Sequence, residues 1–298
     1  MDVLNNKKLL GLAMAAAMGV GVAGNTQAAS YAIAYDNIFN WSITDNSTGG
    51  LLIPTTSLYD TESHAELMGN LTVIDDQNAP NPPVSSYAAL GGGSADNTFV
   101  FVGPGGSNYG WADGDISIGS ESEKIGEAYV GNGTAGAGSV NTLDLTFNVG
   151  PNGTTLTFDF DAEKYLEAWT TGTQIGDFAE ADNNFNITIV DSVGNTVFDW
   201  SPDGILGGGI NGGVENADAF DLSRDLFASS GNPGPLTFNG AGNFNATTFQ
   251  LAAGNYSLGV SNEVHAHVSA VPEPASMLLL GGGLIGLAYA RRRRHMNA

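Results

Sequence analysis

Apolar and polar positions alternate with a period of two along much of this chain. Between residues 142 and 149 every second residue is apolar, from Leu143 to Val149, and residues 154–161 repeat the pattern. This period, with one polar face, is typical of antiparallel sheet that buries one side. Strand-like windows occur at residues 31–43, 71–75, 97–103, 115–119, 142–149, 154–162, 185–192, 195–200, 246–251, 255–261 and 263–270.

Glycine and asparagine punctuate these windows and predict turns, because both residues tolerate positive φ. Residues 149–153 (Val-Gly-Pro-Asn-Gly) and 193–195 (Val-Gly-Asn) are predicted hairpins. Residues 161–170 fit either a helix or a continuing strand, and a short helix is expected near residues 217–227 inside the Gly-rich segment 203–236. Many short strands with such turns predict a mainly β domain, an antiparallel β-sandwich or jelly-roll-like fold.

The N-terminus has a different pattern. Two lysines precede an apolar run at residues 9–24, and the small residues Ala28 and Ala29 follow. This order is typical of an export signal. Residues 1–29 are therefore predicted to be a signal peptide, cleaved after Ala28 or Ala29, and an uncleaved N-terminal membrane helix is the alternative.

The C-terminus contains a second apolar run, residues 275–290, which has no charged residue. It is somewhat shorter than the ~20 residues that span a bilayer comfortably. The prolines before it disfavour helix for the residue that precedes each of them, and an arginine block after it would stay cytoplasmic. The run therefore predicts a transmembrane helix with the domain outside. The flanking residues are Pro272, Glu273 and Pro274 on one side and Arg291, Arg292, Arg293 and Arg294 on the other.

Taken in order, the Pro-Glu-Pro motif, the apolar run and the arginine block resemble the PEP-CTERM sorting signal of Gram-negative bacteria. The resemblance implies processing by an exosortase, a membrane cysteine protease-transpeptidase, and association with exopolysaccharide and biofilm. It makes Pro272, Glu273 and Pro274 the recognition motif and the four arginines the stop and retention signal. A plain C-terminal anchor is the alternative. The predicted division is a signal peptide (1–29), an acidic Gly/Asn-rich β domain (30–270) and a sorting signal (271–298).

The net charge of the chain limits the classes of partner that it can bind. The whole chain has a formal net charge of −22, and residues 31–271 contain 29 acidic and 3 basic residues, which gives −26. Such a surface repels nucleic acid and anionic lipid headgroups, so nucleic-acid binding is excluded. The chain has no cysteine, so an exported domain of this sequence contains no disulfide.

Three sets of side chains could hold a metal ion. Glu263, His265 and His267 alternate along one face of the last window, and two imidazoles with a carboxylate could begin a Zn²⁺ or Cu²⁺ site. No further ligand is identifiable, and the solvent face of an edge strand explains the pattern as well. The other two sets are carboxylate pairs that could bind Ca²⁺: Asp159 with Asp161, and Asp113 with Asp115. No resident cofactor is predicted, and Ca²⁺ is the ion that these pairs would favour.

Two classes of function remain. The first is a non-catalytic, exported protein of the cell surface or extracellular matrix, with an exosortase, extracellular polysaccharide and, through the C-terminal helix, the inner membrane as partners. The second is a carbohydrate-binding module or lectin, ahead of a glycan-active enzyme. An enzyme would need two carboxylates about 5–10 Å apart in a concavity lined by aromatics. The four tryptophans could form a sugar platform or belong to the core. No catalytic motif is found, so the protein is predicted not to be an enzyme.

Overall fold

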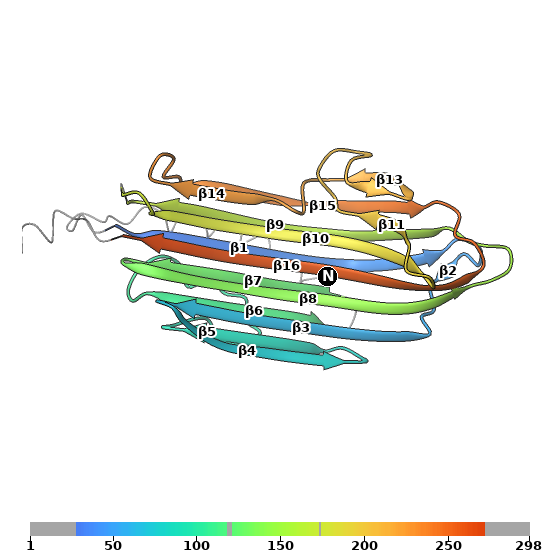
Figure 1. Cartoon of the computed structure of the whole chain (residues 1–298), viewed down its shortest axis with the longest axis horizontal. Coiled ribbons are helices and arrows are strands. Elements are labelled where there is room, and N and C mark those ends of the chain that lie inside the picture. Colours follow the sequence, from blue (N-terminus) through green and yellow to red (C-terminus); the bar gives the residue numbers. More distant parts are fainter. Residues whose placement is uncertain (1–27, 118–120, 173, 272–298) are drawn as a thin grey trace, which may run out of the picture.

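The computed structural model describes residues 28–271, except 118–120 and 173, and these residues form two antiparallel sheets packed face to face (Figure 1). The predicted β-sandwich is confirmed. Sheet A consists, in spatial order, of β13 (Gly213–Asp218), β15 (Leu236–Thr248), β9 (Leu156–Thr170), β1 (Ser30–Asp45), β7 (Glu121–Val130), β6 (Tyr109–Ser117) and β5 (Val84–Leu90), with β2 (Gly50–Leu51) paired to β1.

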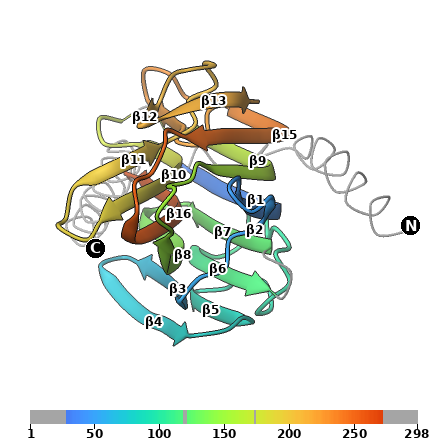
Figure 2. The same cartoon turned by 90° about the vertical axis from the view of Figure 1, so that its right-hand side faces the viewer.

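Sheet B faces sheet A across the core, as the view along the strands shows (Figure 2). It consists, in spatial order, of β12 (Ile210–Asn211), β11 (Thr196–Trp200), β10 (Phe178–Asp191), β16 (Gly254–Ala270), β8 (Gly133–Val149), β3 (Thr56–Leu67) and β4 (Asn70–Ala79), with β14 (Asp225–Ser229) paired to β10. The strands in the middle of both sheets are long. Residues 161–170, which fitted a helix or a strand, form the second half of β9.

The turn at residues 150–153 joins the two sheets. It connects β8 of sheet B to β9 of sheet A, and these two strands pair with other partners. The predicted hairpin at this position is therefore wrong, because alternation identifies a strand but does not identify its neighbour. The hairpin at residues 193–195 is confirmed, since β10 and β11 on either side of it pair directly.

Two other predictions about local structure are wrong. Residues 97–103 were expected to be a strand, but they belong to the connection between β5 and β6, which lies on the outer face of sheet A. Phe99 and Phe101 there pack against aromatic side chains of that sheet, so their apolar character reflects tertiary packing. The helix expected near residues 217–227 is replaced by the end of β13, a loop and the start of β14.

The interior between the sheets has two apolar clusters of different character. Towards the end where β1 terminates, the side chains are large and aromatic, and Phe160 contacts Phe185 and Phe244 at ring-centroid distances of 5.2 Å. Towards the end where β1 begins, alanine predominates. The sheets approach closely there, because a Cβ on Gly110 of sheet A would collide with the carbonyl oxygen of Gly136 of sheet B.

The tryptophans mostly pack within the domain and do not form the sugar-binding platform that was considered as an alternative. Trp111 and Trp200 are fully buried, and Trp41 stacks on Phe160 with a centroid distance of 5.0 Å. Trp169 contacts Tyr31 on the outer face of sheet A. The four side chains therefore do not form one exposed aromatic surface.

Candidate functional site

The first and last strands of the domain meet at one end of the sandwich, which we call the junction end. β1 begins at Ser30 and β16 ends at Ala270. The Ser30 hydroxyl donates to the carbonyl oxygen of Ser269 at 2.7 Å. Ala28 is buried, and the N–H of Ala29 donates to a threonine hydroxyl of the loop after β9. Both expected signal-cleavage positions, after Ala28 or after Ala29, thus adjoin the strand that leads into the sorting motif.

A buried carboxylate holds the chain where it leaves β16. Asp177 is 2 % exposed, and its Oδ1 accepts the N–H of Val271 at 2.6 Å. Its Oδ2 accepts the N–H of Gln174 at 2.7 Å. The carboxylate therefore joins the loop between β9 and β10 to the residue that directly precedes Pro272.

The sorting residues themselves lie outside the described part of the chain. These are Pro272, Glu273, Pro274, Arg291, Arg292, Arg293 and Arg294. The same holds for most of the predicted signal peptide and for the predicted transmembrane helix. Among residues 28–271, apart from the two gaps, no helix is long and apolar enough to cross a membrane.

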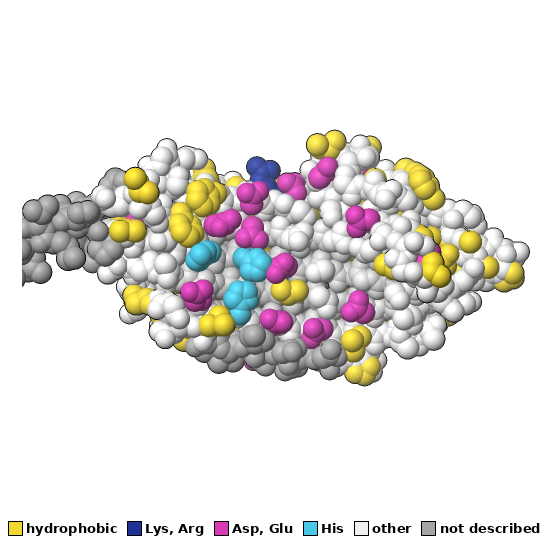
Figure 3. Space-filling view, in the orientation of Figure 1, with side chains coloured by type: hydrophobic (Ala, Val, Ile, Leu, Met, Phe, Trp, Pro, Cys, Tyr) yellow, Lys and Arg dark blue, Asp and Glu magenta, His cyan; other side chains and the backbone are white. Residues whose placement is uncertain are grey.

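Histidine and carboxylate side chains gather over the outer face of sheet B (Figure 3). His265 on β16 lies between two carboxylates, with Nδ1 3.1 Å from Asp182 Oδ1 and Nε2 3.0 Å from Glu263 Oε1. These hydrogen bonds raise the pKa of His265 to about 10. The ring of His64 on β3 lies 5.7 Å away, and Gly138 on the strand between them leaves room for both rings.

This arrangement differs from the predicted start of a metal site. Both nitrogens of His265 face carboxylates, so neither is directed at a common ion with its neighbours. His267 lies apart and contacts the ring of Phe178 edge-on at 5.0 Å. Burial and the positive charge on His265 lower the pKa of His64. The expected edge strand is also wrong, because β16 lies between β10 and β8. The group is therefore an ion-pair cluster on the outer surface of sheet B.

The predicted carboxylate pair on β9 is surrounded by asparagines of neighbouring strands. Asn245 Nδ2 donates to Asp159 Oδ2 at 2.7 Å, and Asn40 Nδ2 donates to Asp161 Oδ2 at 2.7 Å. Asn243 Nδ2 reaches both carboxylates, at 3.2 and 3.3 Å. We call this the asparagine face of sheet A. It is a half-exposed surface whose amides and carboxylates present both donors and acceptors.

The second carboxylate pair does not form one site. Asp113 on β6 is buried, and its Oδ2 accepts the N–H of Asn97 at 2.7 Å. Burial raises its pKa to about 7. Asp115, two residues along the same strand, is half-buried, and burial together with Glu121 raises its pKa as well. Within the described residues, no group of three or more histidine or acidic side chains could hold a metal ion.

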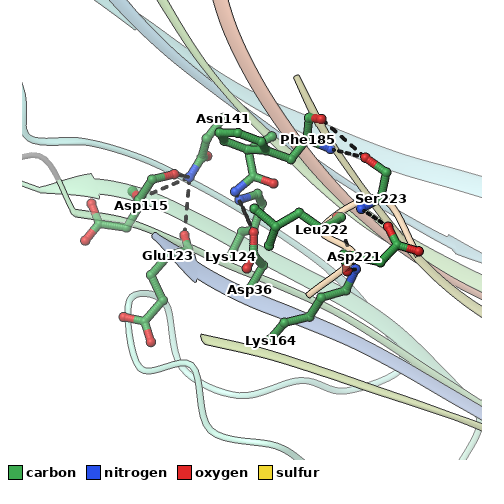
Figure 4. Close-up of polar contacts among 12 residues, drawn as sticks. Asp36, Asp115, Glu123, Lys124, Asn141, Lys164, Phe185, Asp221, Leu222 and Ser223 are labelled. Atoms are coloured by element: carbon green, nitrogen blue, oxygen red, sulfur yellow. Dashed lines mark hydrogen bonds and ion pairs between the residues drawn. The ribbon is translucent and has the colours of Figure 1, made fainter. Parts of the chain in front are cut away.

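A buried polar layer crosses the core between the two apolar clusters, and sequence reasoning missed it (Figure 4). Lys124 and Lys164 flank Asp36 on the neighbouring strands of sheet A, in direct register. Asparagines face them from sheet B. The members of the polar layer are Asp36, Lys124, Asn141, Lys164, Asn183 and Asn262, each at most 3 % exposed.

The sequence does contain a signal for this layer. Lys164 continues the inward-facing series of β9, because every second residue before it, from Phe158 to Ala162, is fully buried. A lysine at such a position is unusual, since burying a charge requires a partner. Lys164 Nζ donates to the carbonyl oxygens of Asp221 and Leu222 at 3.3 and 3.1 Å, and burial lowers its pKa to about 8.

Comparison with known proteins identifies the C-terminal segment. Residues 270–294 match the model of the PEP-CTERM protein-sorting motif. No curated protein matches the chain. Among solved structures, infectious bursal virus derived T=1 particles and infectious bursal disease virus strain Gt are each 11% identical to the chain, with TM-scores of 0.13 and 0.11. The alignments cover 90% and 84% of this chain and 84% and 79% of those chains.

TM-scores this low carry no argument about the fold or function of the domain. The matched motif begins at the last residue of β16, at the junction end of the sandwich. The chain therefore carries a PEP-CTERM protein-sorting motif, which implies that it is exported and is processed by an exosortase at the membrane.

Proposed function

We propose that the mature domain is a non-catalytic protein of the cell surface or extracellular matrix, delivered by an exosortase into a biofilm exopolysaccharide layer. The observation that carries this proposal is the position of the sorting motif, which follows β16 without an intervening linker domain. A sandwich joined to its delivery signal in this way is suited to permanent display at a surface.

The asparagine face supports polysaccharide as the partner. Asp159 and Asp161 accept hydrogen bonds from asparagine amides, and these carboxylates and amides lie half-exposed or exposed on the sheet surface. Rows of amides and carboxylates can hydrogen-bond to sugar hydroxyls. Because these carboxylates are already held by asparagines on the surface of a sheet, their arrangement favours binding over acid–base catalysis.

Sedimentation with the host exopolysaccharide tests this function. The purified mature protein should co-sediment with the polysaccharide, and the variant Asn243→Ala/Asn245→Ala should bind more weakly. The exposed variant Asn255→Ala, at the start of β16, is the control for a general loss of amides. Release of new reducing ends from the polysaccharide would overturn the non-catalytic assignment, and the absence of co-sedimentation would overturn the matrix role.

A pocket between the sheets favours the second candidate, a carbohydrate-binding module. It has a volume of about 60 Å³ and is lined by aromatic side chains, including Trp41 and Tyr59, together with the amides of Asn141 and Asn262. Aromatic walls with a few polar groups are typical of ligand sites. A cavity of about 150 Å³ accepts benzene, so this pocket would take a substituent of a sugar rather than a whole ring. Trp41→Ala should weaken binding on a glycan array if the pocket is used.

A further inference from the structure

Three buried side chains meet inside the polar layer and connect the two sheets. Lys124 Nζ on β7 lies 3.6 Å from Asp36 Oδ2 on β1. Asn262 Nδ2 on β16 donates to that same oxygen at 2.7 Å. Lys124 and Asp36 are fully buried, and Asn262 is 2 % exposed. One carboxylate oxygen thus lies between an amine of sheet A and an amide of sheet B.

These side chains are incompletely satisfied. In the described part of the chain, Lys124 Nζ, Asp36 Oδ1 and Asn262 Oδ1 have no hydrogen-bond partner. Folded proteins leave few buried polar atoms unpaired, and each such atom calls for an explanation. Here three of them belong to side chains that already converge on one point.

We propose that Lys124 and Asn262 form an intramolecular isopeptide bond, with Asp36 as the group that transfers the proton. The uncharged Nζ of Lys124 attacks Cγ of Asn262 and forms the new N–C bond. Asp36 accepts a proton from Nζ and delivers it to Nδ2 of Asn262. The Cγ–Nδ2 bond then breaks and ammonia leaves, so atoms and electrons balance without any further reactant.

The positions of the groups suit each step. The leaving nitrogen, Asn262 Nδ2, already hydrogen-bonds to the carboxylate oxygen from which it would take its proton. The attacking amine lies beside the same oxygen. Holding the reacting groups together in a fixed geometry replaces the entropy cost of bringing them together, and a positioned carboxylate serves as both base and acid.

The environment also supplies a reactive amine. Burial lowers the pKa of Lys124 to about 8, even though the nearby Asp36 acts in the opposite direction. A larger fraction of the amine is therefore uncharged near neutral pH, and a desolvated amine is the nucleophilic form.

The product would give the Lys124 nitrogen a covalent partner and would change the mechanics of the domain. The new amide N–H can donate to Asp36, and the free charge on Lys124 disappears from the core. The bond would join β7 of sheet A to β16 of sheet B. Because β16 leads directly into the sorting motif, a load applied through the C-terminal end would pass into both sheets. A chain without cysteine would thereby gain a covalent cross-link.

Lys164 provides an internal comparison. It lies opposite Asp36 on the other neighbouring strand, in direct register. It is 1 % exposed, but its Nζ donates to two backbone carbonyl oxygens and is not left unpaired. We therefore expect Lys164 to stay unmodified, which makes it the matched control.

Mass spectrometry of the mature protein tests the bond. The two ends are first identified from their terminal peptides, and the intact mass is then compared with the mass of the sequence between them. The wild-type protein should be lighter by the mass of one ammonia molecule. Digestion with a protease specific for acidic residues should release one branched peptide that contains both Lys124 and Asn262.

Variants separate the roles of the three side chains. Lys124→Arg and Asp36→Asn should restore the full mass, whereas Lys164→Arg should keep the loss of ammonia. If the first two variants fail to fold, the intact mass of the wild-type protein and its branched peptide are sufficient to test the bond. An unreduced wild-type mass would overturn the proposal and leave a buried ion pair. Loss of water with a Lys124–Asp36 link would also overturn it.

Discussion

The N–H of Val271 lies 2.6 Å from Asp177 Oδ1, so a buried carboxylate of one loop holds the residue that precedes the Pro-Glu-Pro motif. The same carboxylate closes its own loop through the N–H of Gln174. The chain that leaves β16 is therefore held in place up to Val271, the residue before the Pro-Glu-Pro motif. This sets a limit on how much free chain separates the domain from the processing site.

The first prediction concerns this contact. Asp177→Ala removes the acceptor for both N–H groups, and hydrogen bonds to a charged group contribute about 1.5–3 kcal/mol each. We expect amide hydrogen exchange to accelerate at Val271 and at Gln174 in the loop between β9 and β10, with little change in the middle of β16. The exposed variant Asp225→Ala on β14 is the control. Unchanged exchange at Val271 would contradict the role of the contact.

The second prediction concerns Glu127, which is buried beneath the connection between β5 and β6. Its carboxylate accepts five hydrogen bonds of 2.6–2.9 Å. The donors are Tyr31 Oη, Tyr109 Oη, Trp111 Nε1 and the N–H groups of Val102 and Gly103.

Glu127→Ala leaves these buried donors unpaired, at a cost of about 1–3 kcal/mol for each group that water cannot reach. We expect a loss of at least about 3 kcal/mol in the free energy of unfolding, measured by urea denaturation, and faster proteolysis of residues 94–107. Tyr31→Phe removes one donor only and should cost about 1 kcal/mol. Equal effects of the two variants would show that Glu127 does not organise this connection.

The third prediction concerns pH and the two histidines of the surface cluster. An unfolded histidine has a pKa of about 6.5, and in the fold the pKa of His265 is raised to about 10. The stabilisation from His265 is therefore complete below pH about 6.5 and is lost as the pH rises to about 10. The half-exposed position of the side chain makes the effect modest.

The contribution of His64 to stability has the opposite sign. Its pKa is lowered in the fold, so protonation below its unfolded pKa opposes folding. The Tm difference between wild type and His265→Gln should be largest near pH 6 and should vanish near pH 10. His64→Gln should raise the Tm at acidic pH and leave it unchanged at alkaline pH. Parallel pH profiles for the two variants would contradict the arrangement of charges around His265.

The fourth prediction concerns Asp113, whose pKa is raised to about 7 by burial. A carboxyl group whose pKa is raised in the folded protein favours the folded state when it is protonated. Its contribution to stability is therefore present at low pH and is lost as the pH rises towards 7. Asp113→Asn should therefore gain Tm relative to wild type between pH 4 and pH 7. The exposed control Asp225→Asn should show no such trend. A constant difference across this range would mean that Asp113 stays ionised.

The sequence predicted the type of fold because the outward and inward positions of long strands differ in polarity. β9 is the clearest case, since Leu156, Phe158 and Phe160 all face the core as the alternation requires. The partners of each strand could not be obtained in this way. Residues 150–153 have the composition of a hairpin turn, yet they lead from one sheet to the other, because only packing of the whole sandwich decides which strands pair.

The buried polar layer shows a second limit. Lys124 and Lys164 were recognisable in the sequence as two rare basic residues in an acidic domain, but their partners were not. Asp36 and Asn262 are 226 residues apart and meet only because β1 and β16 lie on facing sheets. Glu263 and His265 share one face of β16 as expected. The carboxylate of Asp182 also contacts His265, and no local sequence pattern could place its strand beside β16.

The final prediction concerns the sorting motif. Exosortase processing should leave a mature protein that lacks the four terminal arginines and ends near Pro274. Replacing Pro272, Glu273 and Pro274 by alanines should leave export intact and block processing, so that full-length protein accumulates in the membrane fraction. The prolines keep the preceding chain extended, which a protease requires, and alanine would let it become helical.

The arginine block has a separate role that a second variant isolates. An arginine near the bilayer centre costs ~2.5–3.5 kcal/mol on insertion scales, so four of them would oppose passage of the predicted helix through the membrane. Deleting residues 291–294 should therefore weaken membrane retention before cleavage while the Pro-Glu-Pro motif stays intact. Membrane fractionation measures the retention, and mass spectrometry of the C-terminal peptide from exosortase-positive cells measures the processing. If the chain through Ala298 is the dominant species there, the segment is a plain tail anchor, because a processed substrate cannot keep its arginines.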